Sequence, residues 1–79
     1  IQPRAPTHKL IIPKQHIANL NEVSDKDLQL IGHIHFIAAT VAKKLGIAEK
    51  GYRVVNNCND AGGQTVFHLH FHLLGGRAM

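Results

Sequence analysis

Residues 66 to 74, Val66-Phe67-His68-Leu69-His70-Phe71-His72-Leu73-Leu74, alternate imidazoles with large apolar side chains. Successive side chains of a β-strand point to opposite faces, so this alternation predicts a strand with one apolar face and one histidine face. The apolar face is expected to pack on the core. The other face would carry His68, His70 and His72 in a row, and three potential cations side by side add little stability to a sheet. The row therefore suggests a function.

One long helix is predicted over residues 25 to 45. Apolar side chains recur there at helical spacing, and Gly46 is a typical residue at which a helix ends. The segment Ser24-Asp25-Lys26-Asp27 resembles a capping box with Asp in place of the usual Glu. The apolar stripe of this helix is wide, which predicts that it packs on two surfaces.

Two more strands complete the predicted fold. Residues 8 to 12 form a short apolar strand that Pro13 ends, because proline lacks the amide that a central strand needs. Residues 51 to 56 form another strand, which the polar loop 57 to 64 joins to the histidine strand as a hairpin. The order strand, helix, strand, strand predicts an α+β domain with an antiparallel sheet backed by one long helix.

The composition is that of one small globular domain. The 79 residues suffice for a single core, and 44% apolar against 18% charged residues argues against a disordered chain. Cys58 is the only cysteine and cannot form an internal disulfide, and no apolar run of about 20 residues occurs, so we expect a cytoplasmic protein without membrane contact. The formal charge is +4, and this positive charge favours phosphate-bearing ligands. The basic residues are scattered along the chain and form no block, so they give no reason to expect nucleic acid.

A metal site is one possible use of the histidine row, because neutral imidazole is a common zinc ligand. In a strand, however, the Cα atoms of His68 and His72 would be about 13 to 14 Å apart, too far for all three rings to bind one ion. Two of them with His8 or His16 would be needed, and the chain has no His-Glu-x-x-His or Cys-x-x-Cys spacing. We therefore predict no metal and no cofactor.

Phosphate chemistry is the second possibility. One imidazole can attack phosphorus while its neighbours bind the oxygens and protonate the leaving group, and adjacent rings can hold different protonation states near neutral pH. The segment Gly62-Gly63-Gln64-Thr65 stands just before the row, where backbone amides could approach an anion. A pair of glycines between strands is more often a simple turn, and a single histidine is more often an ordinary surface residue. The combination favours a phosphate site.

The histidine row resembles the motif of the histidine triad (HIT) superfamily, in which histidine and apolar residues alternate before two further apolar residues. Other segments resemble its Hint-like, nucleotide-binding phosphoramidase branch: Pro3-Arg4-Ala5-Pro6-Thr7-His8, Ile12-Pro13-Lys14-Gln15-His16-Ile17, Gly51-Tyr52-Arg53, Gly62-Gly63-Gln64 and Leu74-Gly75-Gly76-Arg77. By this resemblance, residues 1–79 form a single HIT-like domain, the C-terminal portion of a family member, without the N-terminal strands and C-terminal tail of its relatives.

The resemblance implies a metal-independent hydrolase of purine nucleoside 5′-phosphoramidates, such as conjugates of AMP or GMP with an amine. His70 would attack the α-phosphate, expel the amine and carry a nucleotidyl group that water then removes. His72 and Thr65 would contact the phosphate and the leaving group, His68 would orient His70 through its backbone, and His8 would extend a proton relay. The resemblance thus implies four catalytic histidines: His8, His68, His70 and His72. By the same resemblance, phosphate and nucleotide contacts would come from Asn57, Gly63, Gln64, Thr65, His70 and His72.

The resemblance also implies a homodimer in which the long helix and the strand 51 to 56 meet their twofold mates and join two sheets. Two alternative functions stay open: a dinucleoside polyphosphate hydrolase that uses the same triad on an anhydride, and a nucleotide-binding regulatory or scaffolding dimer. We expect His16, His33 and His35 to be surface or packing residues.

Overall fold

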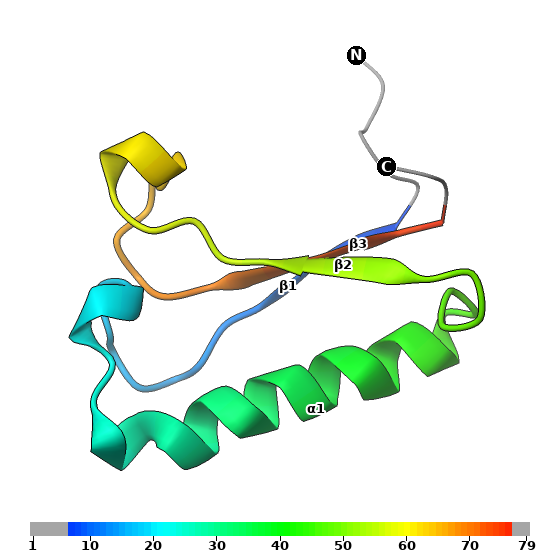
Figure 1. Cartoon of the computed structure of the whole chain (residues 1–79), viewed down its shortest axis with the longest axis horizontal. Helices are drawn as coiled ribbons and strands as arrows, with labels where there is room; N and C mark the ends of the chain where they lie inside the picture. Colours follow the sequence, from blue (N-terminus) through cyan, green and yellow to red (C-terminus); the bar gives the residue numbers. More distant parts are fainter. Residues whose placement is uncertain (1–6, 77–79) are drawn as a thin grey trace.

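The computed structural model describes residues 7–76. The resembling segments at Pro3 to Pro6 and at Arg77 lie outside this range. Within it, four main elements follow one another in the order strand, helix, strand, strand, as predicted (Figure 1). They are β1 (Thr7–Ile11), α1 (Leu28–Lys44), β2 (Tyr52–Val55) and β3 (Phe71–Gly75), with short 3-10 helices at η1 (Leu20–Glu22), η2 (Asp25–Asp27) and η3 (Asp60–Gly62).

The three strands form one antiparallel sheet in the order β1-β3-β2. The predicted hairpin of β2 and β3 is confirmed, but the predicted start of its second strand at residue 66 is wrong, since β3 begins at Phe71. Pairing with β1 ends at Ile11 opposite Phe71, just before Ile12 and Pro13, and proline cannot donate to a ladder. Pairing with β2 ends at Val55. The chain before Phe71 therefore has no strand on either side within the described residues.

The alternation of faces nevertheless continues through this unpaired part. Leu69 and Leu73 are fully buried and Phe71 nearly so, whereas His68, His70 and His72 between them are half-buried. Main-chain pairing is also replaced locally, because the amide of Leu69 donates to the carbonyl oxygen of Ile17 at 2.6 Å. The predicted apolar face and histidine face are thus confirmed outside a regular strand.

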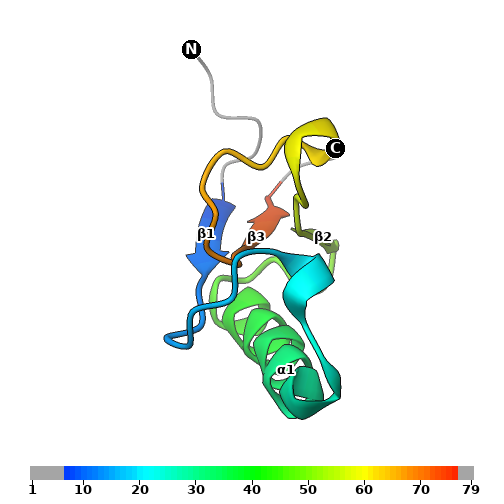
Figure 2. The ribbon, with the colours of Figure 1, turned by 90° about the vertical axis from the view of Figure 1, so that its left-hand side faces the viewer.

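Helix α1 covers the apolar face of the sheet (Figure 2). Its buried residues are Ile34, Ala38 and Ala42. Ile34 belongs to one apolar cluster and Ala42 to a second, and Val54 of β2 packs against both clusters. Elsewhere on the helix, Leu28 and Phe36 remain 66% and 69% exposed. The sequence predicted two packed surfaces, and within the described residues the helix packs on one.

Hydrogen bonds fix both ends of the helical segment. The Asp27 carboxylate is buried and accepts from the Ser24 amide at 3.0 Å and from the Gln15 side chain at 3.1 Å, and the first of these bonds is the main reason that its pKa is lowered. The predicted capping box is confirmed, although its first turn is 3-10 rather than α. At the other end Gly46 has φ +75°, and Ile47 donates to the carbonyl of Ala42, as in a Schellman motif.

No helix between residues 7 and 76 is both long enough and apolar enough to cross a lipid bilayer.

Leu73 anchors the central strand against the helix, so shortening it should destabilise the fold. We expect Leu73→Ala to lower the free energy of unfolding by about 2 to 5 kcal/mol, because the buried cavity cannot fully collapse. The same change at the exposed Leu20 should cost less than about 0.5 kcal/mol. Urea denaturation measures both, and equal losses would contradict this description of the core.

Candidate active site

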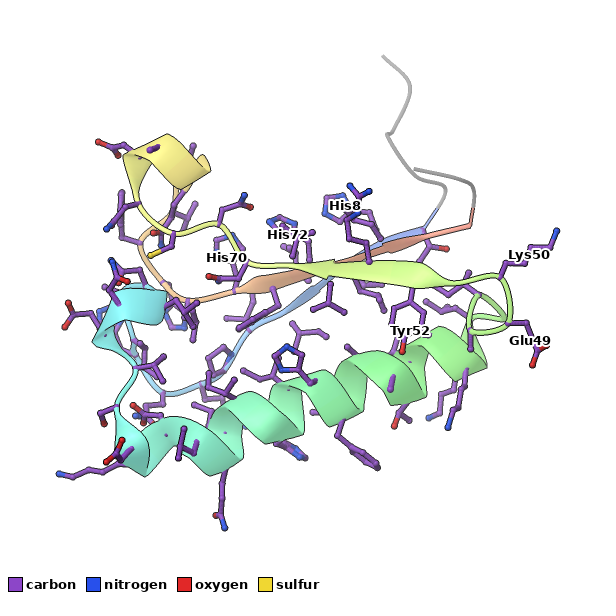
Figure 3. The ribbon with its side chains drawn as sticks, viewed as in Figure 1. His8, Glu49, Lys50, Tyr52, His70 and His72 are labelled. Carbon is purple, nitrogen blue, oxygen red and sulfur yellow. The ribbon has the colours of Figure 1, made fainter. Side chains whose placement is uncertain are left out.

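Three imidazoles gather on the face of the sheet that points away from α1 (Figure 3). His8 comes from β1, His72 from β3, and His70 from the unpaired residues just before β3. The rings of His8 and His72 lie 5.1 Å apart between centroids, and those of His70 and His72 lie 5.2 Å apart. The structure therefore brings together three of the four histidine side chains that the sequence nominated as catalytic.

The His70 ring has one nitrogen held by the main chain. Its Nδ1 lies 2.7 Å from the carbonyl oxygen of His68. A carbonyl oxygen can only accept, so Nδ1 carries the proton, and the neutral ring keeps its lone pair on Nε2. His68 is itself fixed, because its Nε2 donates to the carbonyl of Pro13 at 2.9 Å. His68 thus contacts His70 with its backbone, while its own side chain is tied to the chain after β1.

The side chains of His72 and His8 are joined by a hydrogen bond. His72 Nδ1 and His8 Nε2 are 2.8 Å apart, so one of the two nitrogens donates and the other accepts. Burial lowers the pKa of His72, and the nearby rings of His70 and His8 lower it further when they are charged. His72 is therefore kept neutral near pH 7. A neutral ring can pass a proton in either direction along the pair.

The loop between β2 and β3 stands on the same side of the sheet as the histidines (Figures 1 and 2). Gln64 is buried at its centre, where its Nε2 donates to the carbonyls of Ala18 and Val66 and its Oε1 accepts from the amide of Asn59. Asn59 has φ +59°, a conformation that is strained for a residue other than glycine and that this bond helps to hold. Gln64 therefore uses its side chain to shape the loop.

This loop alters the expected phosphate contacts. The backbone amides of Gly63 and Gln64 donate to Asp60 and Asn59 at 3.0 Å, so these two amides also serve the turn. Gly63 adopts φ +83°, which suits glycine. The sequence suggested amides open to an anion, but both are used within the chain. Asn57 is half-buried and donates its Nδ2 to the carbonyl of Gly62 at 2.8 Å, whereas Thr65 is exposed.

The remaining histidines fall into two groups. His35 packs its ring edge on Phe71 and its Nδ1 lies 2.8 Å from the carbonyl of Ile31, and His33 is exposed, as expected of packing and surface residues. His16 contacts the site, since its ring lies edge-on to His68 at 5.3 Å. No local sequence pattern predicts that contact. Among residues 7–76, no three side chains of His, Cys, Asp or Glu are arranged to hold a metal ion.

Asn56 also lies beside the site, although no sequence pattern predicts it. This half-buried residue follows β2 and donates its Nδ2 to the carbonyl oxygen of His70 at 2.9 Å. Its neighbour Asn57 was nominated because of the family resemblance, whereas Asn56 belongs to no motif. Only the pairing of β2 with β3 brings it beside His70.

The class of protein is defined by its fold and site: one helix packs on a small antiparallel sheet that carries a row of histidines. Comparison of the sequence with known families identifies the family. All 79 residues match the family model described as HIT domain, so the chain belongs to the HIT family. Its full length is 51% identical to the purine nucleoside phosphoramidase of Escherichia coli strain K12, and it spans 66% of that protein, just under two thirds.

Solved structures of the same family agree with the fold. The chain is 55% identical to a HIT family hydrolase from Legionella pneumophila Philadelphia 1, with a TM-score of 0.95 over 98% of this chain and 69% of that one. It is 60% identical to a HIT family hydrolase from Clostridium thermocellum, with a TM-score of 0.93 over 98% of this chain and 67% of that one. The fold described above is therefore that of solved HIT family proteins.

We predict that His72 titrates below its ordinary pKa of 6.5 in an NMR pH titration, because the fold favours its neutral ring. The folded protein therefore binds this proton less readily than the unfolded chain does. Above the ordinary pKa the titration of His72 does not affect the free energy of unfolding, and that free energy falls as the pH falls toward the lower pKa of His72 in the folded protein. In His70→Asn one neighbouring charge disappears, and the midpoint of His72 should rise partway back. A midpoint at or above 6.5 in the parent protein would contradict the description of this pair.

Proposed function

We propose that this chain carries the catalytic centre of a hydrolase of purine nucleoside 5′-phosphoramidates. The observation that carries the proposal is the bond from His70 Nδ1 to the carbonyl of His68, which leaves Nε2 as a free nucleophile on the open face of the sheet. The Escherichia coli relative is a purine nucleoside phosphoramidase, which supports the substrate class. The positive formal charge also favours a phosphate-bearing ligand.

The proposed reaction has two steps. His70 Nε2 attacks the α-phosphorus and forms a P–N bond, and the amine leaves with the electron pair of the bond that breaks. A protonated His8 passes its proton to Nδ1 of His72 through their hydrogen bond while His72 Nε2 releases its own proton to the amine, so both rings end the step neutral. Water then attacks the nucleotidyl-histidine, gives a proton to His72, and releases the nucleoside monophosphate and free His70. These imidazoles supply the nucleophile, the acid and the base without a metal or cofactor.

The phosphate contacts in this proposal come from fewer loop residues than the sequence suggested. Asn57 keeps Oδ1 beyond its one bond to Gly62, and the Thr65 side chain is exposed immediately before the row. Both remain proposed contacts, together with His70 and His72. Gly63 and Gln64 would instead hold the shape of the loop from which Asn57 and Thr65 act.

Intact-mass spectrometry tests the nucleophile directly. Protein quenched briefly after mixing with adenosine 5′-phosphoramidate should gain one nucleotidyl group, and His70→Ala should gain none and lose at least about 10⁴-fold in turnover. The matched control is His33→Ala, an exposed histidine on α1, which should behave as the parent. Diadenosine polyphosphate assayed in parallel distinguishes anhydride hydrolysis. Binding of AMP without an adduct or turnover would contradict the enzyme and favour the regulatory dimer.

We also propose that two copies form a homodimer through α1 and β2. Strand β2 is an edge of the three-stranded sheet, and an unpaired edge is open to another strand. Phe36 on α1 is 69% exposed and Tyr52 on β2 is 37% exposed, so apolar surface is present on both elements. Burial between copies would add to a core that is small for independent stability.

Sedimentation analysis should show a dimer at micromolar concentration. Phe36→Asp should shift the protein toward monomer, because it would bury a charge in the interface. Leu20→Asp, which makes the same kind of change at an exposed apolar residue of η1, should leave the dimer intact. A parent protein that sediments as a monomer would contradict the proposed assembly.

A further inference from the structure

Asn56 stands where the sheet stops supporting His70. The last pair of the β2–β3 ladder is Val55 with His72, and beyond it no regular strand pairs with the chain that carries His70. At this point the side chain of Asn56 turns inward, and its Nδ2 donates to the main-chain carbonyl of His70 at 2.9 Å. A side-chain amide thus takes the place of a main-chain amide one residue after the ladder ends.

This bond determines the orientation of the Asn56 amide. The His70 carbonyl can only accept, so Nδ2 must face it and Oδ1 must face the other way. Oδ1 is then buried, and no partner for it is found among the described residues. A buried acceptor without a partner destabilises the folded state, whereas an apolar side chain of similar size would avoid that penalty. The unpaired Oδ1 thus offsets the stability gained from the bond to His70, so a gain in stability does not by itself account for an asparagine here.

We propose that Asn56 is a positioning residue that holds the main chain of His70 so that Nε2 stays directed at the phosphorus. His70 is restrained at two points: its ring by the carbonyl of His68 and its carbonyl by Asn56. With the second restraint removed, the backbone of His70 can rotate and carry the ring with it. The proposal rests on the function proposed above, because it assigns to His70 the attack on phosphorus.

The test compares Asn56→Leu with the parent protein. Leucine has the same branching and the same number of side-chain heavy atoms as asparagine but no donor, so kcat should fall about tenfold through misplacement of the nucleophile, while KM changes by less than about twofold. The thermal midpoint should stay close to that of the parent, since removal of the unpaired buried oxygen offsets the loss of the bond to the His70 carbonyl. Asn56→Asp, which keeps the shape but presents an acceptor to the His70 carbonyl at neutral pH, should lower kcat at least as much.

Val54→Ala is the matched structural control. Val54 lies two residues earlier, on β2, and packs against both apolar clusters of the core. It should lower the thermal midpoint and leave kcat unchanged. A folded Asn56→Leu protein with the kcat of the parent, or a fall in kcat that Val54→Ala reproduces, would overturn the positioning role.

A second measurement does not depend on substrate. The ¹³C resonance of the His70 carbonyl should shift in both Asn56 variants, because it loses a hydrogen bond, and should not shift in Val54→Ala. If the parent protein turns over no phosphoramidate, the proposed function fails, and this resonance alone decides the inference. An unchanged carbonyl resonance in both Asn56 variants would then overturn it.

Discussion

The hydrogen bond from His70 Nδ1 to the carbonyl of His68 determines the chemistry that this site can perform. It fixes the tautomer, so the lone pair is on Nε2 and faces the open side of the sheet. The bond needs a carbonyl that no neighbouring strand has already used. That condition is met because β1 ends before Pro13 and β2 ends at Val55, so the chain at His68 runs outside the ladder.

The apolar residues of the same segment hold this irregular chain in place. Leu69 is fully buried and its amide donates to Ile17, and Phe71 and Leu73 continue the buried row into β3. Since side chains alternate, burial of these three residues obliges the histidines to face the other way. Helix α1 therefore orients the histidine row from the opposite face of the sheet.

Much of the fold could be predicted from local patterns, because alternation, helical spacing and capping are properties of neighbouring residues. Three such predictions hold: Ser24 and Asp27 form a capping box, Gly46 ends the helix, and alternate residues from Leu69 to Leu73 are buried. The site was less predictable, because its decisive contacts join distant residues. Gln64 meets Ala18 across 46 positions, Asn56 meets His70 across 14, and the start of β3 depends on where two other strands end.

The most direct test of this account is the protonation of the His70 ring in the substrate-free protein, measured by ¹⁵N NMR above the pH at which the ring is charged. The account predicts a proton on Nδ1 and none on Nε2, because only Nδ1 faces a carbonyl oxygen. A ring protonated on Nε2 would have no nucleophilic nitrogen on the open face, and that result would contradict the assignment of His70 as the attacking residue.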